Sequence, residues 1–294
     1  MRTAAGPALV AALADDLDRL LSAEPDVRAD RPDSVHSMRV ATRRLRSVLR
    51  SYRKVFHDKP IGEIRDELRW LAGLLGVARD AEVRAERFAA LTEEQPTEQR
   101  RIGRRLVSAE RAKYTRAHKA VLRALDGDRY ANLRERLTQL RSDPPLHKKR
   151  AKAEAADIFS AVLRKDFRRL RTMVRAEPEV PETDRVEHLH EIRKAAKRLR
   201  YSSDAAIGVL NGPAEELARN AKKLQSVLGD HRDAIEAVAM IQTRAAAART
   251  RGAETDVYDA LSMSEAAAAR KALENYPVAA EFLQTKYRHR DMLG

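Results

Sequence analysis

An all-α fold is the structure that this 294-residue sequence predicts, and three observations lead to it. Alanine and leucine dominate the 43% of hydrophobic residues, whereas aromatic residues reach only 4%, and such a composition favours helices over strands. Runs rich in valine, isoleucine and threonine, which strands prefer, are absent. Charged residues make up 35% of the chain while apolar residues keep helical spacing. This combination is typical of helices with one buried and one solvated face.

The chain also contains an internal repeat. The sequence HSMRVATRRLRS begins at His36, and the similar sequence HEIRKAAKRLRY begins 154 residues later, at His190. Further along, LLGVARDAE matches VLGDHRDAI, and upstream AEPDV matches AEPEV at the end of an Ala/Leu-rich segment. Three matching blocks in the same order predict a tandem duplication that divides near Pro144 and Pro145. We therefore expect a single domain, 1–294, made of two repeats, 1–144 and 145–294.

In the first repeat the spacing of apolar residues predicts helical segments at 7–23, 33–56, 60–75, 80–93, 97–126 and 128–141. The opening residues MRTAAGPALVAALADD are interpreted as the start of the first helix, because one basic residue and an interrupting Gly-Pro are atypical of a secretion signal. Asp33 and Ser34 favour the start of the second segment. Pro60 stands at the start of the third, where proline is tolerated, and Gly76 follows its end as a typical helix stop.

The second repeat predicts counterparts at 148–176, 185–208, 213–228, 232–251, 254–275 and 277–290. Pro213 and Gly229 occupy the positions that Pro60 and Gly76 occupy in the first repeat. Short connections between helices favour antiparallel neighbours. We therefore expect a helical bundle in each half.

The overall positive charge of the chain indicates that its partner is an anion. A net charge of +14 and a pI near 10.2 predict salt-sensitive binding to polyanions. The chain has no cysteine, which excludes disulfides, thiolate catalysis and thiolate metal sites. No apolar run approaches the ~20 residues of a membrane span. These properties predict a cytoplasmic protein without a membrane partner.

The first repeated block predicts a helix with two different faces. At about 100° per residue, His36, Arg39, Arg43, Arg46 and Arg50 fall on one strip about 80° wide. The opposite side is apolar and is expected to pack into the core: Met38, Ala41, Leu45, Val48, Leu49 and Tyr52. A solvated helix face ordinarily mixes charges of both signs, so this unbroken cationic strip indicates an anion-binding surface.

The second block repeats the pattern. Its cationic strip is His190, Arg193, Lys197 and Arg200, and its core side is Ile192, Ala195, Leu199 and Ala206. Arginine presents a planar fork of donors that fits phosphate oxygens. Successive strip residues rise by roughly 4.5–6 Å along the helix axis, a spacing that can follow a chain of phosphates. Flanking cations extend the candidate set: Arg44, Lys194, Arg198, Arg69 and Lys222.

The second repeated motif, LG..RD, supplies further candidates. Arg79 and Arg232 are expected to project toward the two strips. Asp80 and Asp233 are expected either to cap the following helix or to hold an arginine in place. The alternative interpretation of the motif is a capped turn with a surface ion pair, which contributes little to stability.

His36 and His190 are the two histidines that match between the repeats. Three roles remain open for them: phosphate donor, phospho-acceptor or buried structural residue. Their place on the strips favours donation to an anion. Neighbouring cations should lower the pKa of each imidazole, and a bound polyanion should raise it. His188 and His190 would point about 200° apart on a helix, so they cannot share a metal ion, and no metal site is predicted.

These motifs resemble those of the conserved-histidine α-helical domain, the CHAD family, over nearly the whole chain. The resemblance implies two four-helix bundles related by a pseudo-twofold axis, with the basic helices facing a central groove or pore that binds inorganic polyphosphate. It also implies association with polyphosphate granules. Because the chain has no room for the triphosphate-tunnel domain of some members, it is similar to the stand-alone type. The binding set that the resemblance implies is His36, Arg39, Arg43, Arg46, Arg79, His190, Arg193, Lys197, Arg200 and Arg232.

We expect non-catalytic binding of inorganic polyphosphate, with no cofactor and no catalytic residue. The first alternative is a protein that binds the RNA or DNA backbone. The strips hold neither interleaved aromatics for base stacking nor Asn or Gln for base edges, so nucleic acid is expected to bind more weakly and with strong salt dependence. The second alternative is a phosphoryl-transfer enzyme or regulator that uses histidine. Carboxylate clusters in register and a P-loop, which such chemistry commonly uses, are absent from the sequence.

Overall fold

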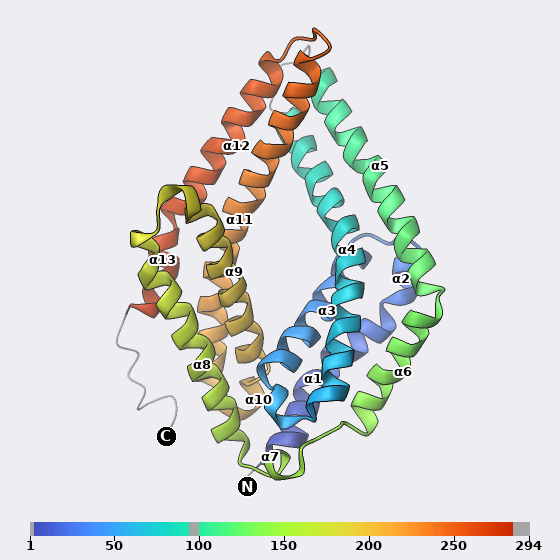
Figure 1. Ribbon diagram of the computed structural model, residues 1–294, viewed down its shortest axis with the longest axis vertical. Helices are drawn as coiled ribbons and strands as arrows, with labels where there is room; N and C mark the ends of the chain where they lie inside the picture. The colour runs from blue at the N-terminus through green and yellow to red at the C-terminus, as the bar shows by residue number, and fades with distance from the viewer. Residues whose placement is uncertain (1–2, 94–99, 285–294) are drawn as a thin grey trace.

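The computed structural model describes residues 3–93 and 100–284 of the chain (Figure 1). These residues form α-helices and short 3-10 helices, with no strand among them and two isolated β-bridges, Ala4–Glu154 and Phe56–Leu146. The predicted all-α fold class is confirmed.

The helices of the N-terminal half are α1 (Ala5–Ser22), α2 (Glu24–Arg28), α3 (Ser34–Ser51), α4 (Asp58–Glu93), α5 (Arg100–Leu125) and α6 (Asp128–Ser142). Those of the C-terminal half are α7 (Lys148–Ala151), α8 (Ala155–Ala176), α9 (Glu182–Asp204), α10 (Ile207–Leu210), α11 (Gly212–Arg249), α12 (Asp256–Glu274) and α13 (Tyr276–Ala280). The 3-10 helices are η1 (Arg53–Val55), η2 (Glu177–Glu179) and η3 (Glu281–Leu283). Of the expected segments, residues 97–99 and 285–290 lie outside the described ranges.

The expected helix ends at Gly76 and Gly229 are wrong, because α4 and α11 continue through both glycines. Asp80 and Asp233 therefore cap no helix. A glycine in a helix interior costs about 1 kcal/mol relative to alanine. The packing of neighbouring helices along α4 and α11 contributes more stability than this cost removes. Both glycines lie beneath an arginine of the facing motif helix, where a Cβ atom would stand within 3.6 Å of the guanidinium.

The expected helix starts at the two prolines are confirmed, whereas the expected capping by Asp33 is not. Pro60 and Pro213 lie in the first turns of α4 and α11, as expected. Asp33 occupies the N-cap position of α3 with a φ of 57°, but its side chain makes no capping hydrogen bond. Its carboxylate lies instead 3.5 Å from Arg79 Nη1, because α4 passes alongside.

The helices form two arms that meet at both ends (Figure 1). α4 and α5 run side by side in one arm, and α11 and α12 in the other. The helices that carry the repeated basic motif are α3 and α9. α3 packs against the long helix α4 of its own arm, and α9 packs against the long helix α11 of the other arm. The arms join at the base, where α3 packs against α9 and α1 against α8. The predicted division at Pro144–Pro145 falls in the non-helical stretch between α6 and α7, and the two-repeat organisation itself stays a prediction.

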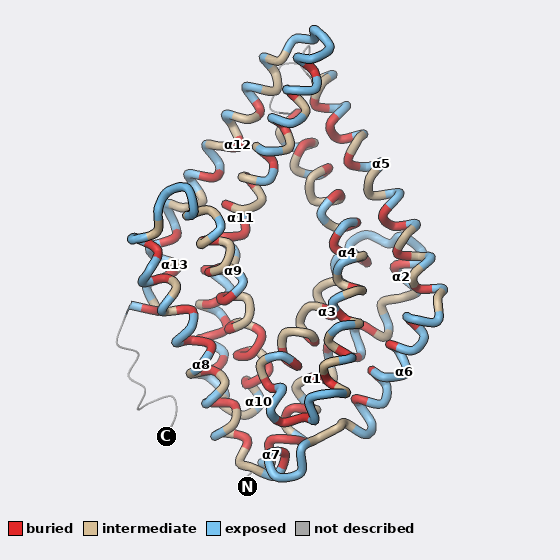
Figure 2. The backbone as a smooth tube through the Cα atoms, viewed as in Figure 1, coloured by how far each residue is buried: buried red, intermediate tan, exposed pale blue. Residues whose placement is uncertain are grey.

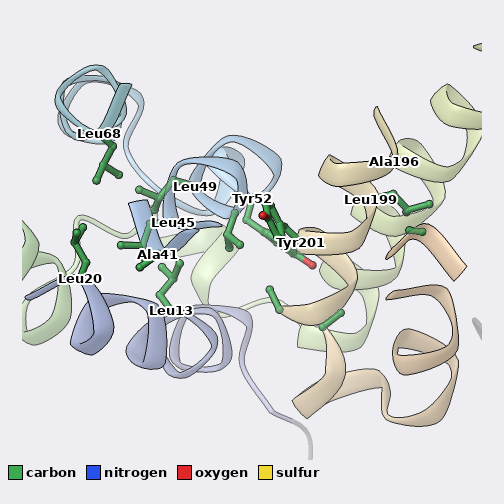
Figure 3. Packing of buried hydrophobic residues seen from close by; sticks show 14 of the residues in the cluster. Leu13, Leu20, Ala41, Leu45, Leu49, Tyr52, Leu68, Ala196, Leu199 and Tyr201 are labelled. Carbon is green, nitrogen blue, oxygen red and sulfur yellow. The ribbon is translucent and has the colours of Figure 1, made fainter. Parts of the chain in front are cut away.

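The main hydrophobic core fills the base (Figures 2 and 3). Leu45 and Leu49 of α3 and Leu199 of α9 are fully buried in it. Tyr52 joins the two halves, because its ring lies 4.7 Å from that of Phe159 and its hydroxyl donates to the Ser202 carbonyl at 2.8 Å. The base is therefore a continuous core across both halves.

A second, small core closes the tip. Its buried residues come from all four arm helices: Phe88, Leu106, Val107, Ala237, Ile241 and Leu261. Beside it, Arg87 of α4 donates two hydrogen bonds to the Glu265 carboxylate of α12, the Nε bond measuring 2.7 Å. Only 2% of the Glu265 side chain is exposed. The arms therefore contact each other at the tip as well as at the base.

Candidate anion-binding site

The two motif helices bury their apolar sides as expected. The predicted core residues of α3 are buried: Met38, Ala41, Leu45, Val48, Leu49 and Tyr52. Those of α9 and the residues after it are buried as well: Ile192, Ala195, Leu199 and Ala206. Because the strip residues lie on the other side of each helix, this packing aims both strips away from the core.

Contact between α3 and α9 brings the middle of the two strips together. Arg43 and Lys197 are each partly buried at this contact, with Arg39, Arg193 and Arg200 close around them. No ion pair among the described residues supplies a carboxylate to Arg43 or Lys197. The strips therefore converge on Arg43 and Lys197, two cationic residues for which the described residues provide no carboxylate partner.

This crowding changes the protonation of Lys197. Burial, followed by the charges of Arg43 and Arg193, lowers the pKa of the Lys197 ammonium from 10.5 to about 6. The same two causes, burial and neighbouring cations, lower the pKa of Arg43 from 12.5 to about 10. At neutral pH the unliganded Lys197 amine is therefore largely uncharged, and an anion placed there would favour its protonation.

A cleft of about 290 Å³ opens beside this cluster. Its lining comes from α3, α8 and α9: Arg43, Arg46, Ser47, Arg50, Arg169, Glu191, Lys194, Ala195, Lys197, Arg198 and Tyr201. Glu191 pairs with Lys194 of its own helix, one turn on. Tyr201 is buried, and the guanidinium carbons of Arg44 and Arg200 lie 5.5 and 5.4 Å from its ring centroid. The cleft therefore presents cations and offers no exposed aromatic ring.

The LG..RD motif holds the outer strip arginines. Arg39 Nη2 donates to the Asp80 carboxylate at 3.1 Å, so of the two roles expected for this aspartate, holding an arginine is correct. In the other half, Asp233 lies close enough to Arg193 for the guanidinium to favour its charged form, although burial raises the pKa of this carboxyl overall. A Cβ atom on Gly229 would stand 3.3 Å from Arg193 Nε and Nη2, and one on Gly76 would stand 3.6 Å from Arg39 Nε. Each glycine thus leaves room for a guanidinium against the long helix.

This difference predicts unequal effects of alanine at the two glycines. Gly76→Ala is expected to stabilise the protein by about 0.5–1 kcal/mol, because alanine favours the helix and its methyl group makes ordinary contacts. Gly229→Ala is expected to gain less, because the Arg193 guanidinium must shift. Urea unfolding of the two variants measures both free energies. Equal stabilisation would show that Arg193 is not held tightly against α11.

Arg44 and Arg198 have structural partners. Arg44 contacts Asp16 at 2.9 Å and Asp204 at 3.1 Å. Arg198 contacts Asp166 at 2.9 Å and also donates to Ser51 Oγ at 3.2 Å. The side chains of Asp16 and Asp166 are only 3% and 2% exposed, so both arginines neutralise buried carboxylates. Arg198 nevertheless also lines the cleft, whereas Arg44 lies apart from it.

Sequence comparison places the molecule in a family. The profile of the CHAD domain matches residues 11–242, which is more than half of the chain. The chain belongs to the CHAD family.

Two curated relatives come from Mycobacterium tuberculosis, the proteins MT2285 and Rv2226. Each is 35% identical to the chain over 270 residues, which cover 91% of this chain and 51% of the relative. The chain thus spans about half the length of the curated relatives it matches.

Two solved structures share the fold. PptA from Streptomyces chartreusis is 21% identical, with a TM-score of 0.80, and the match covers 95% of this chain and 100% of that one. The CHAD domain from the plant Ricinus communis is also 21% identical, with a TM-score of 0.69 and coverage of 97% and 93%.

The two histidines that match between the repeats, His36 and His190, do not line the cleft. Partial burial and then Arg79 lower the pKa of His36, which is exposed at the start of α3. Partial burial and then Arg232 lower the pKa of His190, whose Nδ1 is buried with no hydrogen-bond partner in the structure. Each imidazole therefore tends to be neutral until an anion approaches it.

The remaining predicted binding residues lie outside the cleft lining. Arg79 contacts Glu82 at 2.8 Å and Arg232 contacts Glu236 at 2.7 Å, so both cations already have partners. Arg69 pairs with Asp66 on the surface of α4, and Lys222 is exposed on α11 without lining the cleft. These cations flank the site and do not form it.

Sequence reasoning missed two residues that line the cleft and one cation that flanks it. Arg169 of α8 and Ser47 of α3 line the cleft. Arg65 of α4 lies close to Arg46 and Arg50 and lowers the pKa of both. Arg65 was accessible from the sequence, since it precedes Arg69 by one helical turn. Arg169 carried no such signal, because it comes from a helix outside the repeated motif.

The described residues form neither a metal site nor a membrane-spanning helix. No group of three or more metal-ligating side chains comes together within the described ranges. His188 contacts the Met173 carbonyl at 2.8 Å, which gives it a structural partner. In the part of the chain that is described, no helix has the length and apolarity needed to cross a bilayer.

Proposed function

We propose that this chain binds inorganic polyphosphate, without turning it over, in the cleft between α3 and α9. The observation that carries the proposal is the pair Arg43 and Lys197, which lie together among other cations of the two strips and to which no ion pair among the described residues supplies a carboxylate. A cluster of half-buried cations repels itself, and a polyanion relieves that repulsion. Arginine-rich walls supply charge-assisted hydrogen bonds to phosphate oxygens.

The lining of the cleft favours a ligand made only of phosphate. Its single aromatic residue, Tyr201, is 5% exposed and already contacts the guanidinium groups of Arg44 and Arg200, so it offers little ring surface to a nucleobase. Proteins that bind single-stranded nucleic acid ordinarily provide stacking surfaces. RNA is the second candidate ligand, held through its backbone charge alone.

Competition between the two polyanions tests this function. At about 150 mM salt, long-chain polyphosphate is expected to displace bound RNA at a far lower phosphate concentration than RNA displaces polyphosphate, because backbone contacts alone weaken steeply with salt. Fluorescence anisotropy of labelled RNA measures the displacement, and a phosphate-release assay on the same samples tests turnover. Equal affinities would favour the RNA candidate, and steady phosphate release would contradict binding without catalysis.

Protonation of Lys197 gives the binding a predictable pH dependence. Because the pKa of Lys197 is about 6 in the free protein, a bound polyanion that raises this pKa makes the complex take up a proton above pH 6. Affinity is therefore expected to fall as the pH rises from 6 toward 9. Titration calorimetry at pH 8 in buffers of different ionisation enthalpy counts the protons taken up. Lys197→Met should lower that count, and an unchanged count would show that the amine is remote from the ligand.

A protein that binds polyphosphate is expected where polyphosphate accumulates in the cell. We propose that the protein resides in the cytoplasm at polyphosphate granules. A fluorescent fusion that stays diffuse in cells with granules, while the purified protein binds polyphosphate, would contradict this localisation.

A further inference from the structure

A second cationic pocket lies beside the cleft. Its volume is about 370 Å³. Its walls are formed by the end of α3, by η1 and α7, and by one face each of α8 and α9. Arg50 and Arg198 line both this pocket and the cleft. The other cations of the pocket belong to neither cationic strip.

The pocket gathers six cations and no carboxylate. Five of them take part in no ion pair among the described residues: Arg50, Arg53, Lys54, Arg150 and Lys165. Elsewhere on the surface, arginines commonly have such a partner, as Arg129 has Glu67 at 2.6 Å and Arg136 has Glu63 at 2.9 Å. Unpaired like charges around one hollow repel each other and favour an anionic ligand.

One wall of the pocket is apolar. Ile158, Ala161 and Val162 lie on successive turns of one face of α8, with Lys165 one turn further. Ala161 is exposed and Ile158 and Val162 are half-buried, whereas Tyr52 and Val55 at the back of the pocket are each only 1% exposed. This wall therefore offers hydrophobic surface beside the cations. A chain of phosphates alone gains nothing from such a wall, whereas a phosphate ester with an apolar or aromatic body uses both.

We propose that this pocket binds a nucleotide-sized phosphate ester, with its phosphates among the cations and its organic body against α8. The volume falls within the range of small-ligand sites, about 300–1,000 Å³. The pocket adjoins the cleft and shares Arg50 and Arg198 with it, whereas Arg150 and Lys165 line the pocket alone. ATP is a suitable probe, because tripolyphosphate carries the same three phosphates without the nucleoside.

Calorimetry without divalent metal at about 150 mM salt compares the two probes. ATP is expected to bind at least roughly tenfold more tightly than tripolyphosphate at this pocket, because only ATP reaches the apolar wall. Arg150→Glu with Lys165→Glu is expected to weaken ATP binding roughly tenfold or more. The matched control, Arg116→Glu with Lys119→Glu, reverses two exposed cations of α5 far from the pocket lining and is expected to change ATP affinity less than about twofold.

A third variant tests the apolar wall directly. Ala161 is exposed and lines the pocket, so Ala161→Trp fills the space without entering the core. It is expected to abolish the preference for ATP over tripolyphosphate. Equal affinities for the two probes in the Arg43→Glu, Lys197→Glu variant, whose cleft no longer attracts a phosphate chain, or equal losses of ATP binding in the pocket and control variants, would overturn the proposal. Arg43→Glu with Lys197→Glu separates the two sites: loss of ATP binding there would place the nucleotide in the cleft and refute a separate pocket, whatever that variant does to polyphosphate.

Discussion

Replacing Arg43 and Lys197 together by glutamate is expected to lower the affinity for long-chain polyphosphate roughly 100-fold or more at about 150 mM salt. The two side chains lie where the strips of α3 and α9 converge, and burial strengthens their interaction with an anion. The variant replaces two donors to phosphate by two acceptors that repel it. Anisotropy titration with labelled polyphosphate measures the loss.

The same variant is expected to remain folded. Arg43 is repelled by the arginines around it, and the same charges lower the pKa of Lys197, so carboxylates at these two positions relieve an unfavourable interaction and circular dichroism should show unchanged helicity. Arg116→Glu with Lys119→Glu changes the net charge equally on an exposed face of α5 and serves as the control. Equal losses in both variants would indicate diffuse attraction and not a built site. Loss of helicity in the first would show that the strips are structural.

Removal of Arg87 is expected to destabilise the tip by about 3–5 kcal/mol. Arg87→Ala leaves the Glu265 carboxylate, whose side chain is 2% exposed, buried without its bidentate partner. Hydrogen exchange should then rise first in the ends of α4, α5, α11 and α12 that form the small core there. Chemical denaturation gives the overall loss of stability.

A double variant distinguishes the charge effect from simple loss of packing. Arg87→Met with Glu265→Leu replaces the pair by apolar side chains beside an apolar cluster and is expected to restore most of the stability. If the double variant is as unstable as Arg87→Ala, the tip depends on the ion pair itself. A fully stable Arg87→Ala variant would mean that the contact between the arms is not maintained in solution.

The two kinds of motif differed in how well the sequence predicted them. The cationic and apolar faces of α3 and α9 were predictable residue by residue, because 3.6-residue periodicity alone determines which side chains share a face. The LG..RD motif was misinterpreted as a helix stop, because glycine after an apolar run commonly ends a helix. Its glycines instead leave space for Arg39 and Arg193, which come from other helices. The sequence around each glycine does not show which side chain of another helix packs against it.

The same distinction separates the candidate residues. Arg44 shares the motif's positive charge, but its partners are Asp16 and Asp204, which lie on α1 and α9 and are remote in sequence. Arg169 lines the cleft from α8 without belonging to any repeated block. Which cations are neutralised by the protein and which are left for a ligand therefore depends on helix packing.

The sequence by itself determined the helical class, the buried face of each motif helix and the presence of two cationic strips, since these follow from the order of residues along one helix. Only the tertiary structure decided that Arg43 and Lys197, 154 residues apart, meet at the same cleft. Their proximity, with burial, is what lowers the pKa of Lys197 to about 6. Electrostatic energy depends on distance in space and on exclusion of water, and neither quantity is written in the spacing of residues along the chain.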